Sequence, residues 1–219
     1  MNVLITGTSR GIGKAAAEKY LSLGHTVYGI DILGASIKDG KYFHYKNDVR
    51  DAKSLPDIKD VAVIVNNAGT QNGEDDIANN LTGAINVTEK YIKSDKLISV
   101  LFNASASSVS GQEFPLYAAS KAGLVGYMKN VAIRLAPRGV TCNAVSFGGV
   151  LTESNAPVIN DPELWKKIMD VTPMKKWATE EEAAEWIVFL TLTNKSMSGQ
   201  NLLIDNGEYG LNSTFVWPE

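Results

Sequence analysis

The sequence alternates short apolar runs with longer segments that suit helices, and this alternation limits the possible folds more than any other feature. Several runs are rich in Val and Ile and continuous, which is typical of strands buried on both faces. We predict strands at residues 2–6, 26–30, 42–45, 61–65, 97–102, 140–145 and 202–204. We predict helices at residues 11–23, 75–93, 117–136 and 179–193. The short connection that follows Asp31 leaves room only for a loop.

Repeated strand–helix units favour an α/β fold, because parallel strands need crossover connections that cover both faces of their sheet. Right-handed crossovers leave few topologies to consider. We therefore predict a doubly wound, parallel sheet of about seven strands with helices on both faces. The chain has no internal repeat and no Pro/Gly/Ser-rich linker, so we predict that residues 1–219 form a single domain.

Composition excludes several classes of function. With 21 Lys+Arg against 24 Asp+Glu, the net charge of −3 gives no general attraction to nucleic acid or to anionic membranes. The single cysteine, Cys142, excludes an internal disulfide and a Cys-rich metal site, as in a reducing compartment. We see no signal peptide and no apolar stretch of the roughly 20 residues that span a bilayer. We expect a cytoplasmic protein without a metal site.

A glycine-rich segment follows the first predicted strand and opens the first predicted helix. In Gly7-Thr8-Ser9-Arg10-Gly11-Ile12-Gly13, the glycines let backbone N–H groups approach a pyrophosphate at a helix N-terminus. The spacing does not fit a P-loop, and too little chain precedes Ser9 for a hydrolase nucleophile elbow. The position therefore predicts a dinucleotide site.

Asp31 ends the second predicted strand, where an acidic side chain can bind the hydroxyls of an adenosine ribose. Its carboxylate would repel a 2′-phosphate by about 4 kcal/mol at about 4 Å and an effective dielectric constant of about 20. Arg10 and Lys14 lie close in sequence and offset part of that repulsion. The balance predicts NAD in preference to NADP.

Tyr117 and Lys121 lie four residues apart at the start of a predicted helix, hence on one face of it. A tyrosine that acts as an acid or a base near pH 7 needs its pKa lowered by about 3 from its usual value near 10. A neighbouring ammonium group at about 4 Å supplies an effect of that order. The pair therefore indicates proton transfer.

Together these motifs resemble the single-domain type of the short-chain dehydrogenase/reductase family, which has a Rossmann-like fold. The resemblance covers nearly the whole chain and rests on six segments in the family's order. They are Thr6–Gly13, Asp48-Val49, Asn66-Asn67-Ala68-Gly69, Asn80-Leu81-Thr82-Gly83, Tyr117-Ala118-Ala119-Ser120-Lys121 and Asp205-Asn206-Gly207.

The resemblance implies a role for each matching position. Tyr117 would be the general acid in reduction and the base in oxidation, Lys121 would lower its pKa, and Asn80 would hold a relay water. Ser105 would donate a hydrogen bond to the substrate oxygen, with Ser107 as the alternative. The residues implied in cofactor binding are Gly7, Ser9, Arg10, Gly11, Ile12, Gly13, Asp31, Asp48, Val49, Asn66, Asn67, Ala68, Gly69, Tyr117, Lys121, Gly148, Val150 and Thr152.

The chain departs from the family pattern at Phe147, which stands where the family usually has proline, and in a shortened segment between Gly69 and Asn80. The leading hypothesis is an NAD(P)-dependent oxidoreductase of a carbonyl/alcohol pair, with 3-oxoacyl thioester reduction as one family activity. The alternative is a dinucleotide-binding regulator that has lost catalysis. The resemblance also implies a homodimer or homotetramer formed through the helices near residues 75–93 and 117–136.

Overall fold

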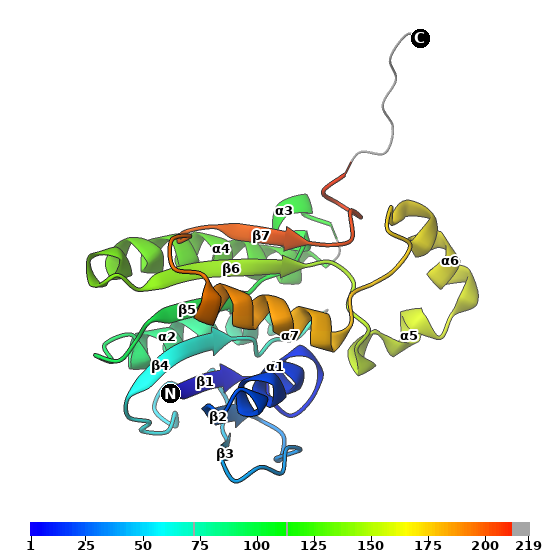
Figure 1. Cartoon of the computed structure of the whole chain (residues 1–219). Helices are drawn as coiled ribbons and strands as arrows, with labels where there is room; N and C mark the ends of the chain where they lie inside the picture. The colour runs from blue at the N-terminus through cyan, green and yellow to red at the C-terminus, as the bar shows by residue number, and fades with distance from the viewer. Residues whose placement is uncertain (72, 113, 212–219) are drawn as a thin grey trace.

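Seven parallel strands lie side by side in the order β3-β2-β1-β4-β5-β6-β7 at the centre of the molecule (Figure 1). The computed structural model describes residues 1–71, 73–112 and 114–211. The strands are β1 (Asn2–Thr6), β2 (Thr26–Asp31), β3 (Tyr42–Lys46), β4 (Val61–Asn66), β5 (Ser99–Asn103), β6 (Thr141–Phe147) and β7 (Asn201–Ile204). This arrangement is the Rossmann-like sheet that the alternating sequence pattern predicts, and every predicted strand is confirmed.

Helices follow most of the strands and cover the sheet. The α-helices are α1 (Gly11–Ser22), α2 (Gly83–Tyr91), α3 (Ser107–Ser110), α4 (Pro115–Leu135), α5 (Ala156–Ile159), α6 (Pro162–Val171) and α7 (Glu180–Val188). Two π-helical segments, η1 (Ile77–Thr82) and η4 (Phe189–Thr193), adjoin α2 and α7, and the 3-10 turns are η2 (Ala136–Arg138) and η3 (Glu153–Asn155). The predicted helices at residues 75–93 and 179–193 cover the regions of η1 and η4, but the wider π-helical turns there were not predicted.

Each face of the sheet has its own hydrophobic core. On one face, α1 and α7 pack together over the strands, with Ala16, Tyr20, Ala183 and Ile187 fully buried (Figure 1). On the other face, α2 and α4 supply buried residues such as Val87 and Met128. Strands covered on both faces need apolar residues at successive positions, which is why β4 reads Val-Ala-Val-Ile-Val with all five residues buried.

The connection from β2 to β3 contains neither helix nor strand, as its length predicted. The other parallel connections between neighbouring strands include helical segments. The edge strand β3 is consequently reached by a loop, residues 32–41, that runs from the end of β2 back to its start, where Tyr42 pairs with Val27.

The carboxyl ends of the strands gather at one edge of the sheet, where α5 and α6 also lie (Figure 1). Chain order reverses between β1 and β4, because β1 leads to α1 on one face and β4 leads to η1 and α2 on the other. Such a reversal opens the crevice in which doubly wound sheets bind ligands. Over residues 1–71, 73–112 and 114–211, no helix has the length and apolar character needed to cross a membrane.

Candidate active site

The turn after β1 is built so that only glycine fits at its key positions. Gly7 and Gly11 have φ of +75° and +62°, a region that residues with a side chain rarely adopt. A Cβ on Gly13 would lie 2.0 Å from the carbonyl oxygen of Gly7. The turn therefore brings the start of α1 against the end of β1, and its backbone remains open to a ligand.

Hydrogen bonds join the end of β1 to the end of β4. The Thr6 hydroxyl oxygen accepts from the backbone N–H groups of Asn67 and Ala68, at 3.0 and 2.9 Å. The Asn67 side-chain amide donates to the carbonyl oxygens of Thr6 and Gly7, at 3.0 and 3.2 Å. These contacts fix the position of the glycine turn relative to β4.

Asn66, one residue earlier, has a structural partner. Its side-chain amide donates to the Thr88 hydroxyl of α2 at 2.9 Å, and both residues are buried. Asn66 therefore anchors α2 to the end of β4, while Ala68 and Gly69 follow at the crevice.

Asp31 and Asp48 both lie at the carboxyl ends of the outer strands, on the side of the expected adenosine. The Asp31 carboxylate accepts from the backbone N–H groups of Ser9 and Leu33, each at 2.9 Å. Arg50 donates to the Asp48 carboxylate through Nε and Nη2 and holds the pKa of that carboxyl below its usual range. Next to it, Val49 is buried against Gly83 at the start of α2.

The remaining residues of the glycine turn face different ways. Arg10 is the N-cap residue of α1 with an extended backbone, and Ile12 packs against the core under α1 and α7. The Ser9 hydroxyl donates to the carbonyl oxygen of Gly34 at 2.9 Å, which links the turn to the loop after β2.

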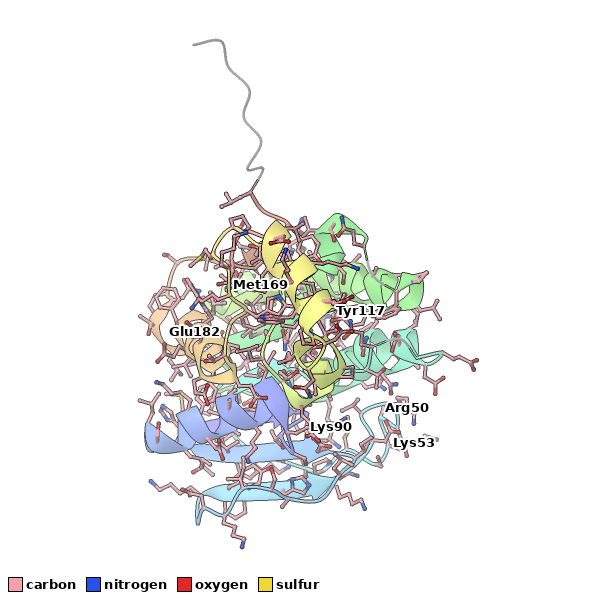
Figure 2. The ribbon with its side chains drawn as sticks, turned by 90° about the vertical axis from the view of Figure 1, so that its right-hand side faces the viewer. Arg50, Lys53, Lys90, Tyr117, Met169 and Glu182 are labelled. Carbon is pink, nitrogen blue, oxygen red and sulfur yellow. The ribbon has the colours of Figure 1, made fainter. Side chains whose placement is uncertain are left out.

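Tyr117 and Lys121 lie in the first two turns of α4, as their spacing predicted. Lys121 is 5% exposed, and its Nζ lies 5.6 Å from the centroid of the Tyr117 ring. Nζ also donates to the carbonyl oxygen of Asn103 at the end of β5, at 2.8 Å. A Cβ on Gly69 would lie 3.5 Å from the same Nζ. A buried positive charge thus lies where β4, β5 and α4 meet (Figure 2 shows this edge of the molecule, with Tyr117 labelled).

Asn80 lies in the π-helical segment η1 and is completely buried. Its side chain accepts from the N–H of Thr70 at 2.7 Å and donates to the Thr70 carbonyl at 2.9 Å and to the Ser120 hydroxyl at 3.0 Å. Widened helical turns are frequent at functional sites. Here the turn directs Asn80 toward α4, one residue away from Lys121.

Ser105 and Ser107 follow β5 and differ in accessibility. Ser105 is 6% exposed, and its hydroxyl accepts from the N–H of Ser107 at 3.2 Å. The Ser107 hydroxyl oxygen, in α3, is enclosed and has no hydrogen-bond partner among the described residues. The neighbouring Ser108 hydroxyl lies 3.1 Å from that of Ser146 on β6. Ser105 is therefore the more accessible of the two candidates.

The end of β6 explains why position 147 is phenylalanine where the family usually has proline. Phe147 extends β6, pairs with Ile204 of β7 and is buried in the core beneath α7. A Cβ on Gly148 would lie 2.9 Å from the backbone of Asp205, so this glycine is needed for packing against β7. Asp205 in turn accepts from the N–H groups of Gly207, Tyr209 and Gly210.

Gly149 and the residues after it return to the glycine turn. A Cβ on Gly149 would lie 1.9 Å from the indole ring of Trp177, which also contacts Trp165 of α6, with ring centroids 5.1 Å apart. Val150 forms a parallel bridge with Ala178. The methyl group of Thr152 lies 3.9 Å from the Cβ position on Gly11, so the segment after β6 closes against the glycine turn.

Sequence reasoning missed several residues that hold this site together. They are Thr6, Thr70, Asn103 and Ser120, each of which contacts a proposed site residue, and Trp177, which contacts Gly149 between Gly148 and Val150. Thr6 and Ser120 lie within the family motifs but had no assigned role, and Asn103 is a polar residue that ends an apolar run. The others depend on contacts between segments distant in the sequence.

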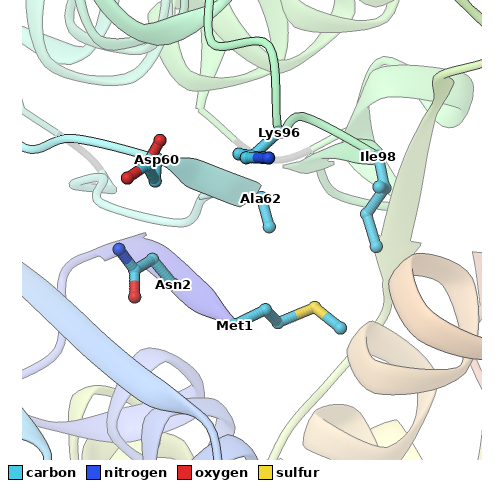
Figure 3. Close-up of a pocket in the computed structure, with 6 residues that line it drawn as sticks. All are labelled: Met1, Asn2, Asp60, Ala62, Lys96 and Ile98. Atoms are coloured by element: carbon cyan, nitrogen blue, oxygen red, sulfur yellow. The ribbon is translucent and has the colours of Figure 1, made fainter.

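Two further findings concern the rest of the described chain. Residues 1–71, 73–112 and 114–211 contain no group of three or more His, Cys, Asp or Glu side chains that could hold a metal ion. A cavity of about 430 Å³ lies among Met1, Asn2, Asp60, Ala62, Lys96 and Ile98 (Figure 3). It lies at the amino ends of the strands, on the opposite edge from Tyr117.

A glycine turn at the reversal of a parallel sheet, with a half-buried tyrosine and a buried lysine paired beside it, defines a dinucleotide-dependent oxidoreductase. The family model described as enoyl-(acyl carrier protein) reductase matches residues 7–208. The chain belongs to the short-chain dehydrogenase/reductase family, which uses NAD(P) and acts on CH–OH/C=O groups. This finding favours the oxidoreductase over the regulator.

Two curated relatives span almost the whole chain. A 3-oxoacyl-acyl-carrier-protein reductase of Buchnera aphidicola is 26% identical, over 94% of this chain and 96% of its own length. A glucose 1-dehydrogenase of Gluconobacter oxydans is 28% identical, over 94% of this chain and 90% of its own length.

Solved structures share the fold. A short-chain dehydrogenase/reductase of Burkholderia thailandensis has a TM-score of 0.88 and 26% identity, over 96% of this chain and 93% of its own. A putative 2-deoxy-D-gluconate 3-dehydrogenase of Agrobacterium tumefaciens with NADP has a TM-score of 0.86 and 24% identity, over 96% of both chains. A 4-hydroxyisoleucine dehydrogenase with NADH has a TM-score of 0.86 and 20% identity, over 96% of this chain and 99% of its own.

The contact between Gly149 and Trp177 yields a prediction. Gly149→Ala should lower the free energy of unfolding by about 1–3 kcal/mol, because the new methyl group must displace a buried ring. The matched control is Gly126→Ala in the middle of α4, where a Cβ meets nothing within 4 Å. It should raise stability by about 0.5–1 kcal/mol. Urea unfolding measures both, and a Gly149→Ala variant as stable as wild type would contradict the packing.

Proposed function

We propose that this protein interconverts 3-oxoacyl and 3-hydroxyacyl thioesters with NAD as its cofactor. The observation that carries the proposal is the buried Lys121 ammonium beside the Tyr117 ring, at the edge where the dinucleotide crevice opens. The thioester is favoured by the name of the Buchnera relative and by apolar residues at this edge. Leu116, next to Tyr117, and Leu151, next to Val150, are 46% and 39% exposed and suit an acyl chain.

The glycine turn fits a dinucleotide, because Gly7 and Gly13 let it pack closely and Gly11, where a Cβ would meet only the Thr152 methyl group, leaves the backbone open at the N-terminus of α1. A bound nicotinamide ring supplies or accepts the hydride. We infer that Asp31 binds the adenosine ribose, that Asp48 and Val49 flank the adenine, and that Asn67, Ala68 and Gly69 line the crevice. Val150 and Thr152 would meet the carboxamide.

Proton transfer is assigned to Tyr117. When hydride reaches a carbonyl carbon, charge develops on the oxygen and a proton must be delivered there. In our proposal the Tyr117 hydroxyl gives that proton, and in the reverse direction the phenolate takes it from the alcohol. The Lys121 ammonium favours the phenolate by its charge. Ser105 donates a hydrogen bond to the same oxygen, and Asn80 positions a water for reprotonation.

Two expectations concern the protein's surroundings. We infer a cytoplasmic location, because the single cysteine, Cys142, excludes an internal disulfide and suits a reducing compartment. We also infer a homodimer or homotetramer that uses α2 and α4, where Ile133 is 75% exposed on the outer side of α4.

Tyr117→Phe should lower kcat by about 10²- to 10⁴-fold, which is the usual contribution of a positioned acid or base. It should still bind NADH, since the lost hydroxyl acts on the substrate. The assay follows NADH oxidation with acetoacetyl-CoA and, in parallel, NAD reduction with glucose. Tyr127→Phe, the same change on the same helix, is the control and should keep kcat within about twofold. A Tyr117→Phe variant as fast as wild type would remove Tyr117 from this role.

The two serines can be separated in the same assay. Ser105→Ala should reduce kcat by about 10²-fold or more, the usual loss when one donor to the reacting oxygen is removed. Ser107→Ala should change kcat much less, because its hydroxyl oxygen is enclosed within α3. The opposite order would assign the hydrogen bond to Ser107.

The cofactor preference depends on Asp31. Asp31→Asn should reduce the ratio of the NADPH and NADH dissociation constants by about tenfold, because a 2′-phosphate no longer meets a carboxylate. Calorimetric titration gives both constants. Asp39→Asn, in the exposed loop before β3, is the control and should leave the ratio unchanged. Wild-type protein that prefers NADPH would refute the NAD assignment.

A further inference from the structure

The connection between β2 and β3 has no helix, so another device must support the residues around Asp31. Two side chains on one face of β3 provide contacts there. The Tyr42 hydroxyl lies 2.8 Å from the Thr8 hydroxyl of the glycine turn and 2.9 Å from His44 Nδ1. His44 Nε2 lies 2.9 Å from the carbonyl oxygen of Leu33 in the loop after β2.

The chemistry of these groups fixes the direction of each hydrogen bond. The Leu33 carbonyl can only accept, so Nε2 of a neutral His44 carries the proton and Nδ1 is an acceptor. Tyr42 must then donate to His44 and accept from Thr8. Burial and the negative charge of Asp31 both raise the pKa of Tyr42, which keeps its hydroxyl proton in place for this donation.

The same two segments hold the Asp31 carboxylate. Its oxygens accept from the N–H of Ser9, next to Thr8, and from the N–H of Leu33, whose carbonyl meets His44. The contacts therefore form a closed ring: Asp31, the glycine turn, Tyr42, His44 and the loop after β2, which returns to Asp31. Strand β3 therefore links the glycine turn to the loop after β2, the two segments whose N–H groups bind the Asp31 carboxylate.

Gly29 shows how closely the ring is fitted. A Cβ on Gly29 would lie 2.4 Å from both the Thr8 hydroxyl and the Tyr42 hydroxyl oxygens. A glycine within a strand lacks a packing side chain and weakens the strand, so it often marks a close approach of this kind. The missing side chain on β2 leaves the space in which the two hydroxyl groups meet.

We propose that Tyr42 and His44 are positioning residues for the adenosine end of the cofactor: they hold the glycine turn and the loop after β2 so that the Asp31 carboxylate faces the ribose. The inference rests on the proposed role of Asp31 in NAD binding. It adds that the preference for NADH over NADPH depends on two residues of β3, which need not touch the cofactor.

Tyr42→Phe tests the inference, because it keeps the aromatic side chain and removes the hydrogen bonds to Thr8 and His44. The NADH dissociation constant should rise about tenfold, as expected for two lost hydrogen bonds, and the ratio of the NADPH and NADH constants should fall. The KM for NADH should rise more than kcat falls. Thr8→Val, which is similar in shape, removes one of the bonds from the other end and should change the constants in the same direction.

Tyr45→Phe is the matched control, on the same strand but packed into the opposite core, and should bind both cofactors as wild type does. Near pH 8, nitrogen–proton NMR correlation should show the proton of His44 on Nε2.

If Tyr42→Phe and Thr8→Val bind NADH within about twofold of wild type with an unchanged ratio, the inference is wrong, even if their melting temperatures fall. A His44 proton on Nδ1 would also overturn it. If wild-type protein binds neither NADH nor NADPH, the proposed function itself fails.

Discussion

The join between β1 and β4 determines how the rest of the molecule is arranged. These neighbouring strands end side by side, yet the chain leaves them toward opposite faces of the sheet. Four hydrogen bonds hold the two ends together: two join Asn67 to Thr6, one joins Asn67 to Gly7, and one joins Ala68 to Thr6. The crevice for the dinucleotide therefore has a fixed floor, although its two walls belong to different layers of helices.

A line of contacts leads from this join to the proposed proton donor. The Asn103 side chain donates to the Asn67 side-chain oxygen at 2.8 Å, and the Asn103 carbonyl accepts from Lys121. Lys121 lies beside the Tyr117 ring. The position of the proposed acid–base pair thus depends on the same strand ends that shape the glycine turn. We regard these contacts as the reason that the cofactor side and the substrate side of the proposed site keep a fixed relative position.

Much of this arrangement could be predicted from the sequence, and the parts that could not have a physical explanation. Strands such as β4 are continuous apolar runs because both faces are covered, and Tyr117 and Lys121 share a helical face by their spacing alone. The π-helical turn at Asn80 escaped prediction, because an extra residue in a turn leaves no compositional trace. The burial of Asn66 against Thr88, and the dependence of Gly149 on Trp177, escaped because both arise from tertiary packing.

The bridge between Val150 and Ala178 affects how such a protein can evolve. The chain leaves the sheet at Val150 and comes back to the same point at Ala178, with the N–H of Leu151 and the N–H of Ala178 closing the bridge. The segment between these residues, which includes α5 and α6, has its two ends held together by the bridge. Its length and composition can therefore vary without displacing a strand. If Leu151 contacts the substrate as we propose, substrate choice can diverge in that segment while the hydride chemistry stays the same.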